Sequence, residues 1–199
     1  MRKNVNQGWS SKSFCFNTGQ SPPKLISVQG AGMHKILERE ALRNKLEALR
    51  KKGKKIAFTN GCFDILHVGH VRYLREAKKT ADVLVLALNS DSSVRSIKGE
   101  KRPLINEKER AEILAALEFI DFITIFEEST PLKLIKSLKP DILIKGGDWP
   151  EEKVVGREEI KKWGGRVVII PEVEGKSTTN IVEKIKQIYC SGNKFIDFN

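Results

Sequence analysis

The chain has 199 residues, of which 40% are hydrophobic and 31% are charged. This size and composition are typical of one globular domain that buries a full core. No stretch approaches the roughly 20 apolar residues that cross a bilayer, and no secretory signal is visible, so we expect a cytoplasmic protein with no membrane partner. The three cysteines form no C-x-x-C pair, which excludes an obvious disulfide framework or zinc site.

The net charge of +11 is concentrated in the N-terminal part of the chain. Residues 1–55 contain 13 Lys and Arg against three Glu, a net charge of +10, so the other 144 residues carry only +1. A basic arm can bind nucleic acid. This arm offers few aromatic residues on which bases could stack, namely Trp9, Phe14 and Phe16. We therefore expect a solvated tail and no nucleic-acid partner.

Residues 1–33 are rich in Ser, Gly, Asn, Gln and Pro and show no hydrophobic period, which predicts a disordered basic leader. Over residues 34–52 apolar side chains recur at helical spacing, and Gly53 ends the pattern, so a helix is predicted there. Its apolar face must pack on its own domain or on a second copy, and we expect a homodimer. One folded domain is predicted over residues 34–190, followed by a tail over residues 191–199.

Beyond residue 55, predicted strands and helices alternate. Near-continuous apolar runs, typical of strands buried on both faces, occupy residues 56–58, 83–88, 122–126, 142–144 and 167–170. Helical patterns cover residues 68–80, 107–119, 131–138, 157–163 and 179–189, the last with Ser177 or Thr178 as its N-cap. This order predicts an α/β fold with a Rossmann-like, doubly wound sheet of five parallel strands, whose ligand site lies at the carboxyl ends of the strands.

Polar residues follow four of the predicted strands, at residues 60–70, 89–91, 145–149 and 174–179. Because the carboxyl ends of parallel strands meet at one edge of the sheet, we expect these four segments to form a single crevice. The first segment contains His67 and His70, which are one helical turn apart and can face the same side. Gly69 leaves room for a ligand near the backbone, and the following helix begins with its positive end there. The segment therefore predicts a phosphate site.

The crevice residues suit one reaction class better than others. Cys62 has no histidine clearly placed to activate it, so we expect it to serve packing. Neither a P-loop nor a Gly-x-Gly-x-x-Gly motif follows the first strand. Nucleotidyl transfer needs mainly positioning and charge stabilisation, and an attacking phosphate monoester, with a second pKa of about 6, arrives ionised. His67 and His70 could then stabilise the α-phosphate in the transition state.

Five segments in this order resemble the cytidylyltransferase-like nucleotidyltransferases, namely residues 60–70, 89–99, 102–110, 145–149 and 173–179. The resemblance covers about residues 35–190 and is strongest to the heptose 1-phosphate adenylyltransferases. It implies transfer of AMP from ATP to D-glycero-β-D-manno-heptose 1-phosphate, which gives ADP-heptose and pyrophosphate for lipopolysaccharide core synthesis. A separate sugar kinase would then supply the sugar phosphate.

The resemblance also implies roles for individual residues. Its catalytic residues would be His67, His70 and Lys98, with Lys98 in the loop after the second strand. Nucleotide contacts are implied for Thr59, Asn60, Gly61, Phe63, Gly69, Asn89, Asp91, Ser177, Thr178 and Thr179. Contacts to the sugar phosphate are implied for Asp64, Arg102, Gly146, Gly147 and Asp148. Mg²⁺ is expected on the triphosphate, held mainly by phosphate oxygens and water, with no metal ligands from the protein.

Some alternatives stay open at this point. Asp64 could cap its turn instead of contacting a ligand, and Arg110 could bind phosphate or pair with Glu107. A cytidylyltransferase for glycerol 3-phosphate is the nearest rival, although its usual Arg-Thr-x-Gly-Ile-Ser-Thr-Thr signature is replaced here by residues 172–179. An aminoacyl-tRNA synthetase would need a tRNA-binding body, and a nucleic-acid binder with a structural core is the most distant alternative.

Overall fold

The computed structural model describes residues 32–147, 150–171 and 175–189. Residues 1–31 of the predicted leader, the predicted tail and Asp148 lie outside this part. The described structure begins at Gly32, two residues before the predicted start of the domain. None of its helices is long and apolar enough to cross a membrane.

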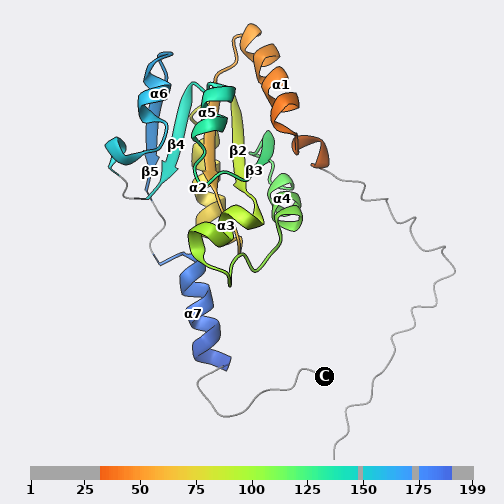
Figure 1. Cartoon of the computed structure of the whole chain (residues 1–199), viewed down its shortest axis with the longest axis vertical. Helices are drawn as coiled ribbons and strands as arrows, with labels where there is room; N and C mark the ends of the chain where they lie inside the picture. Colours follow the sequence, from red (N-terminus) through yellow and green to blue (C-terminus); the bar gives the residue numbers. More distant parts are fainter. Residues whose placement is uncertain (1–31, 148–149, 172–174, 190–199) are drawn as a thin grey trace, which may run out of the picture.

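The core of the fold is a sheet of five strands that pair in parallel in the order β3-β2-β1-β4-β5 (Figure 1). The strands are β1 (Ile56–Gly61), β2 (Val83–Asn89), β3 (Phe122–Phe126), β4 (Ile142–Gly146) and β5 (Arg166–Ile170). The order reverses at β1, the first strand, as expected for a doubly wound sheet. The predicted fold class is confirmed.

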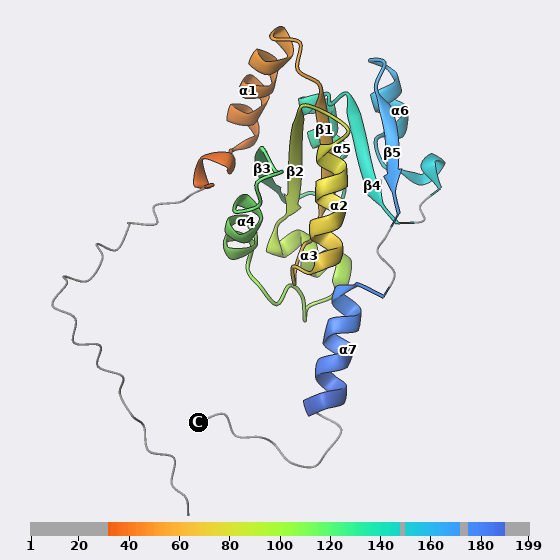
Figure 2. The ribbon, with the colours of Figure 1, turned by 180° about the vertical axis from the view of Figure 1, so that it is seen from behind.

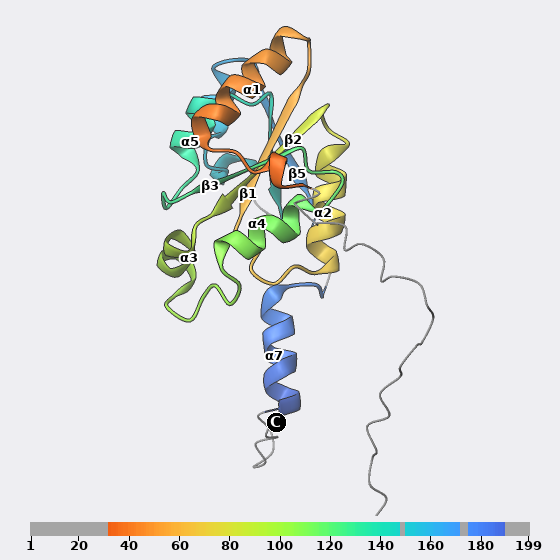
Figure 3. The same cartoon turned by 90° about the vertical axis from the view of Figure 1, so that its right-hand side faces the viewer.

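Helices cover both faces of the sheet. On one face lie α2 (Val68–Lys78) and α4 (Glu107–Ala115), seen from behind in Figure 2. On the other lie α1 (Arg39–Lys51), α5 (Leu132–Leu138) and α6 (Arg157–Lys161). At the carboxyl ends of the strands lie α3 (Asp91–Lys98) and α7 (Thr178–Tyr189), and α7 points away from the body (Figure 3). Two short 3₁₀ helices are η1 (Met33–Lys35) and η2 (Glu151–Lys153).

Alternation along the strands divides the core into two clusters. In β2, Leu84, Leu86 and Leu88 pack with α2 and α4. Val83, Val85 and Ala87 point the other way and pack with α1 and α5. Successive side chains of a strand face opposite sides of the sheet. The face on which a site residue lies therefore follows from its position along its strand.

The helix predicted over residues 34–52 begins later, at Arg39. Ile36 instead bridges to Ile123, and the backbone N–H of Leu37 donates to the Ile123 carbonyl, so this segment extends the sheet beside β3. Leu42 and Leu46 of α1 are fully buried in the core of their own domain. This apolar face is therefore not available to a second copy of the chain.

Helix α3 was not predicted from the sequence. Its only apolar residues are Val94 and Ile97, and two residues are too few to show a helical repeat of apolar positions. Its start is fixed by Ser90, whose Oγ accepts a hydrogen bond from the backbone N–H of Ser93, an N-cap geometry. Lys98 is the last residue of α3. The expectation that Lys98 lies in a loop is therefore wrong, and its position is set by a helix.

Candidate active site

A cleft of about 680 Å³ opens at the carboxyl edge of the sheet. Most of the residues expected at a ligand site line this cleft, and they come from β1, β2, β4, α2, α3 and α7. They are Asn60, Gly61, Phe63, Asp64, His67, Gly69, His70, Asn89, Lys98, Arg102, Gly146, Ser177, Thr178 and Thr179. The convergence of four polar segments into one crevice is confirmed for the described residues.

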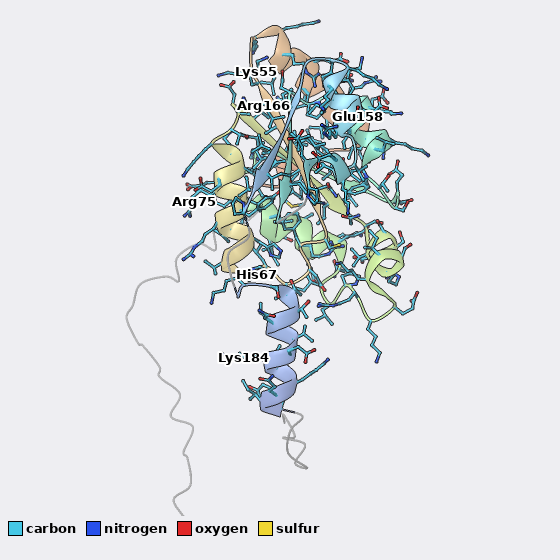
Figure 4. The ribbon with its side chains drawn as sticks, turned by 90° about the vertical axis from the view of Figure 1, so that its left-hand side faces the viewer. Lys55, His67, Arg75, Glu158, Arg166 and Lys184 are labelled. Carbon is cyan, nitrogen blue, oxygen red and sulfur yellow. The ribbon has the colours of Figure 1, made fainter. Side chains whose placement is uncertain are left out.

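The two histidines lie at the start of α2. His67 is the N-cap residue, with extended backbone, and His70 occupies the first turn. Their rings stack with centroids 3.8 Å apart and planes 25° apart. A Cβ on Gly69 would come within 2.9 Å of the His67 ring, so glycine is needed for this stack. Figure 4 shows His67 where α2 meets the beginning of α7.

Phe63, in the turn between β1 and α2, packs against His70. Its backbone has a φ of 45°, in the left-handed region that non-glycine residues seldom adopt. Its ring lies 5.0 Å from the His70 ring, centroid to centroid. A Cβ on Gly61 would come within 2.8 Å of the Phe63 ring, so glycine allows this packing. The turn thus contacts His70 through the Phe63 ring and through a hydrogen bond to the Ile65 backbone.

Burial first, and then the adjacent His67, lower the pKa of His70 from 6.5 to about 4, although a hydrogen bond to the Ile65 backbone partly opposes them. His70 is therefore neutral at pH 7 and carries a single N–H. Burial also raises the pKa of the Cys62 thiol, although Lys98 and Arg110 oppose this shift. A neutral thiol is a poor nucleophile, which agrees with the expectation that Cys62 serves packing.

The low pKa of His70 can be tested by NMR titration of the imidazole ring. In the free protein its midpoint is expected near pH 4, and bound pyrophosphate should raise it because the anion stabilises the imidazolium. An unfolded chain takes up this proton near pH 6.5. His70 should therefore reduce stability progressively as the pH falls from about 6.5 to about 4. A midpoint near 6.5 in the free protein would contradict this environment.

A second helix N-terminus faces the cleft. The Oγ of Ser177 accepts a hydrogen bond of 3.1 Å from the backbone N–H of Asn180, which confirms the predicted N-cap of α7. Thr178 donates through Oγ1 to the carbonyl of Ile65 at 3.5 Å, linking α7 to the turn before α2. The positive ends of α2 and α7 and the hydroxyls of the second helix therefore meet at one place, which suits a polyanion.

Asp64 holds the loop between α3 and α4 against the turn after β1. Its carboxylate accepts hydrogen bonds from Arg102 at 2.5 Å and from the backbone N–H groups of Leu104 and Ile105 at 2.7 and 3.1 Å. Asp64 is buried, with 7% of its surface exposed. Its two oxygens are thus engaged within the protein, and a positioning role agrees better with the structure than a direct contact to substrate.

Arg110 is fully buried and does not pair with Glu107. Its guanidinium donates to the carbonyls of Ile105 and Asn89 at 2.9 Å each, to the carbonyl of Cys62, and to the Asp91 carboxylate at 2.7 Å. Glu107 instead accepts from the backbone N–H of Asp91. Arg110 therefore joins the carboxyl ends of β1 and β2 to the start of α3, and it is not placed to bind phosphate.

Three expected site residues do not line the cleft. Thr59 is fully buried and shares a hydrogen bond of 2.6 Å with the hydroxyl of Tyr73, which itself lines the cleft. Asp91 is engaged by Arg110. Gly147 donates its backbone N–H to the Ile170 carbonyl, which extends the pairing of β4 with β5.

The cleft also contains residues outside the predicted polar segments. Tyr73, Ser129, Thr130, Pro131 and Val155 are among them. Lys145 and Lys176 also line the cleft, and both lie in segments that were expected there, although no individual role was assigned to them. The Ser129–Pro131 turn precedes α5 and gave no signal beyond turn composition.

Curated proteins with similar sequences match most of this chain. Bifunctional protein HldE of Syntrophotalea carbinolica is 57% identical over 158 residues, which cover 79% of this chain and 32% of that protein. HldE of Geobacter sulfurreducens is 53% identical over 173 residues, covering 85% of this chain and 35% of that protein. The chain thus spans about a third of the length of these relatives.

Two solved structures share the fold. The lipopolysaccharide core biosynthesis protein from Thermoplasma volcanium is 32% identical, with a TM-score of 0.52, and the match covers 62% of this chain and 100% of that one. Pantoate-beta-alanine ligase from Francisella tularensis is 16% identical with a TM-score of 0.51 over 79% of each chain, which supports the fold alone. The family model described as cytidylyltransferase-like matches residues 58–194, more than half of the sequence. The chain belongs to the cytidylyltransferase-like family.

Proposed function

We propose that this nucleotidyltransferase transfers AMP from ATP to heptose 1-phosphate, giving ADP-heptose and pyrophosphate. The observation that carries the proposal is the meeting of two stacked imidazoles with the N-termini of α2 and α7 in one cleft. Its support from comparison is the 57% identity to an HldE protein and the similarity to a lipopolysaccharide core biosynthesis protein. A separate sugar kinase would supply the acceptor, and ADP-heptose would serve lipopolysaccharide core synthesis.

In this reaction an oxygen of the acceptor phosphate bonds to the α-phosphorus of ATP. The bond from that phosphorus to the oxygen bridging the β-phosphate breaks, and its electron pair leaves with pyrophosphate. The acceptor is already ionised, so no general base is required. His67 and His70 would donate N–H groups to the α-phosphate as its charge grows, and Ser177 and Thr178 would bind the departing phosphates at the start of α7.

Mg²⁺ fits this site as an ion brought by the triphosphate. Among the described residues that line the cleft, the one carboxylate is Asp64, which already accepts three hydrogen bonds. The described residues also contain no cluster of three or more His, Cys, Asp or Glu suited to a metal. Phosphate oxygens and water would therefore supply the ligands. When bound, Mg²⁺ would neutralise charge on the leaving pyrophosphate.

A pyrophosphate-release panel tests the substrates. Each of the four nucleoside triphosphates is combined with heptose 1-phosphate, hexose 1-phosphates or glycerol 3-phosphate. We expect ATP with heptose 1-phosphate to give the highest kcat/KM, by at least about tenfold. CTP with glycerol 3-phosphate as the best pair would instead establish the rival cytidylyltransferase. Turnover by none of the pairs would overturn the assignment.

A further inference from the structure

Tyr73 lines the cleft, and the proposed reaction gives it no role. It follows His70 by three residues on α2, so the two side chains lie on the same side of the helix. Its ring packs against the end of β4, where a Cβ on Gly146 would come within 3.1 Å of a ring carbon. Tyr73 therefore extends the row of cleft side chains that begins with His67 and His70.

The hydroxyl of Tyr73 shares one hydrogen bond with a neighbouring hydroxyl. Tyr73 Oη and Thr59 Oγ1 are 2.6 Å apart, and either oxygen can be the donor. Each hydroxyl has one proton, so this bond uses one proton of the pair and leaves the other. Within the described residues neither hydroxyl makes a second hydrogen bond. One of the two protons therefore has no acceptor in the described part of the protein.

Burial shows that the remaining proton belongs to Tyr73. Thr59 is 0% exposed, so a proton left on its hydroxyl would be unsatisfied in the core, which native proteins seldom tolerate. Tyr73 is partly exposed and reaches the cleft, where a ligand or water can accept a hydrogen bond. Thr59 therefore donates to Tyr73, and the tyrosine O–H is the donor that faces the cleft.

This hydroxyl is a neutral donor. Burial raises the pKa of Tyr73 to about 12, although the hydrogen bond from Thr59 opposes the shift. The phenol therefore keeps its proton at pH 7 and well above it. A neutral donor can bind an anion without adding a charge to the buried rings beside it, and hydrogen bonds to charged oxygens are the strong ones. A phosphate oxygen is thus the best acceptor that ATP offers to this hydroxyl.

The position of Tyr73 indicates which phosphate it meets. In the proposed reaction Ser177 and Thr178 bind the departing phosphates at the start of α7, and the histidines of α2 contact the α-phosphate. Tyr73 lies on the same side of α2 as His70. We propose that the Tyr73 hydroxyl donates a hydrogen bond to a non-bridging oxygen of the α-phosphate of ATP, and that Thr59 orients this hydroxyl. The inference rests on the proposed function and adds a donor to its nucleotide site.

Binding measured by calorimetry tests the proposal without any acceptor. The ligand is an ATP analogue with a methylene group between the α- and β-phosphates, which cannot be turned over. Tyr73→Phe should bind it about tenfold more weakly than the wild type, since a hydrogen bond to a charged group is lost. Its affinity for pyrophosphate, which has no α-phosphate, should stay within about twofold. Unchanged affinity for the analogue, or an equal loss for pyrophosphate, would overturn the proposal.

Thr59→Val is the matched variant, because it removes the same hydrogen bond but keeps the tyrosine hydroxyl. If Tyr73 contacts the ligand, Thr59→Val should weaken binding of the analogue by less than about threefold. A loss as large as that of Tyr73→Phe would mean that the pair only joins β1 to α2, and the ligand contact would be refuted. A wild-type chain that binds no ATP analogue would instead defeat the proposed function.

A second measurement needs no substitution at Tyr73. The chain has two tyrosines, Tyr73 and Tyr189, so isotope labelling of the ring carbon that carries the hydroxyl gives two NMR signals, which Tyr189→Phe assigns. The Tyr73 signal should move when the analogue binds, because a new hydrogen bond at the hydroxyl changes the shielding of this carbon, and it should move little with pyrophosphate. A Tyr73 signal that saturating analogue leaves in place would contradict the contact.

Discussion

Replacing His67 or His70 with alanine is expected to lower kcat by about 100-fold or more, since one preorganised donor to a developing oxyanion is worth about 3 kcal/mol. Each ring faces the cleft and is only partly buried, so the fold should survive its removal. The measurement is steady-state pyrophosphate release with ATP and heptose 1-phosphate. Thermal unfolding of each variant verifies that the chain remains folded.

The third histidine provides the control for this experiment. His34 is exposed in η1, far from the cleft in the sequence and absent from its lining, so His34→Ala should keep wild-type turnover. Cys62→Ala should also keep most activity, because its thiol is neutral and no step uses it. A folded but inactive Cys62→Ala variant, or full activity without either cleft imidazole, would refute the mechanism.

The parts of the fold that the sequence could predict are those with strong local signals. Strands buried on both faces are nearly continuous apolar runs, so all five were found with errors of a few residues at their ends. The histidine segment was found because a strand, a turn and the start of a helix follow one another within residues 56–70. The cleft followed from topology, since parallel strands place their carboxyl ends together.

Features set by distant contacts could not be predicted in this way. Local spacing suggested Glu107 as the partner of Arg110, but three carbonyls and Asp91 lie within reach of the guanidinium only after the sheet has formed. Lys145 was expected in the crevice, because its segment follows the fourth strand. Ser129, Thr130 and Val155 were not, because their place in the cleft depends on how distant segments pack, which no local pattern reveals.

Arg110→Met is expected to lower the free energy of unfolding by about 3 kcal/mol or more, because it leaves a carboxylate and three carbonyls without their buried donor. The arginine side chain is 0% exposed. Turnover should fall as well, since Arg110 holds the Cys62 turn and the start of the helix that carries Lys98. Urea unfolding gives the stability, and pyrophosphate release at a temperature where the variant is folded gives the activity.

Arg43→Met is the matched control for this substitution. Arg43 pairs with Glu40 on the surface of α1, with the two side chains 45% and 81% exposed. Such a pair contributes about 0.5 kcal/mol or less, so this variant should unfold like the wild type. Arg110→Lys keeps the charge but not the forked set of donors, and it should recover only part of the stability and turnover. If Arg110→Met were as stable as Arg43→Met, the four hydrogen bonds would not be what fixes the cleft, and the ends of β1 and β2 would have to be held by their apolar packing alone.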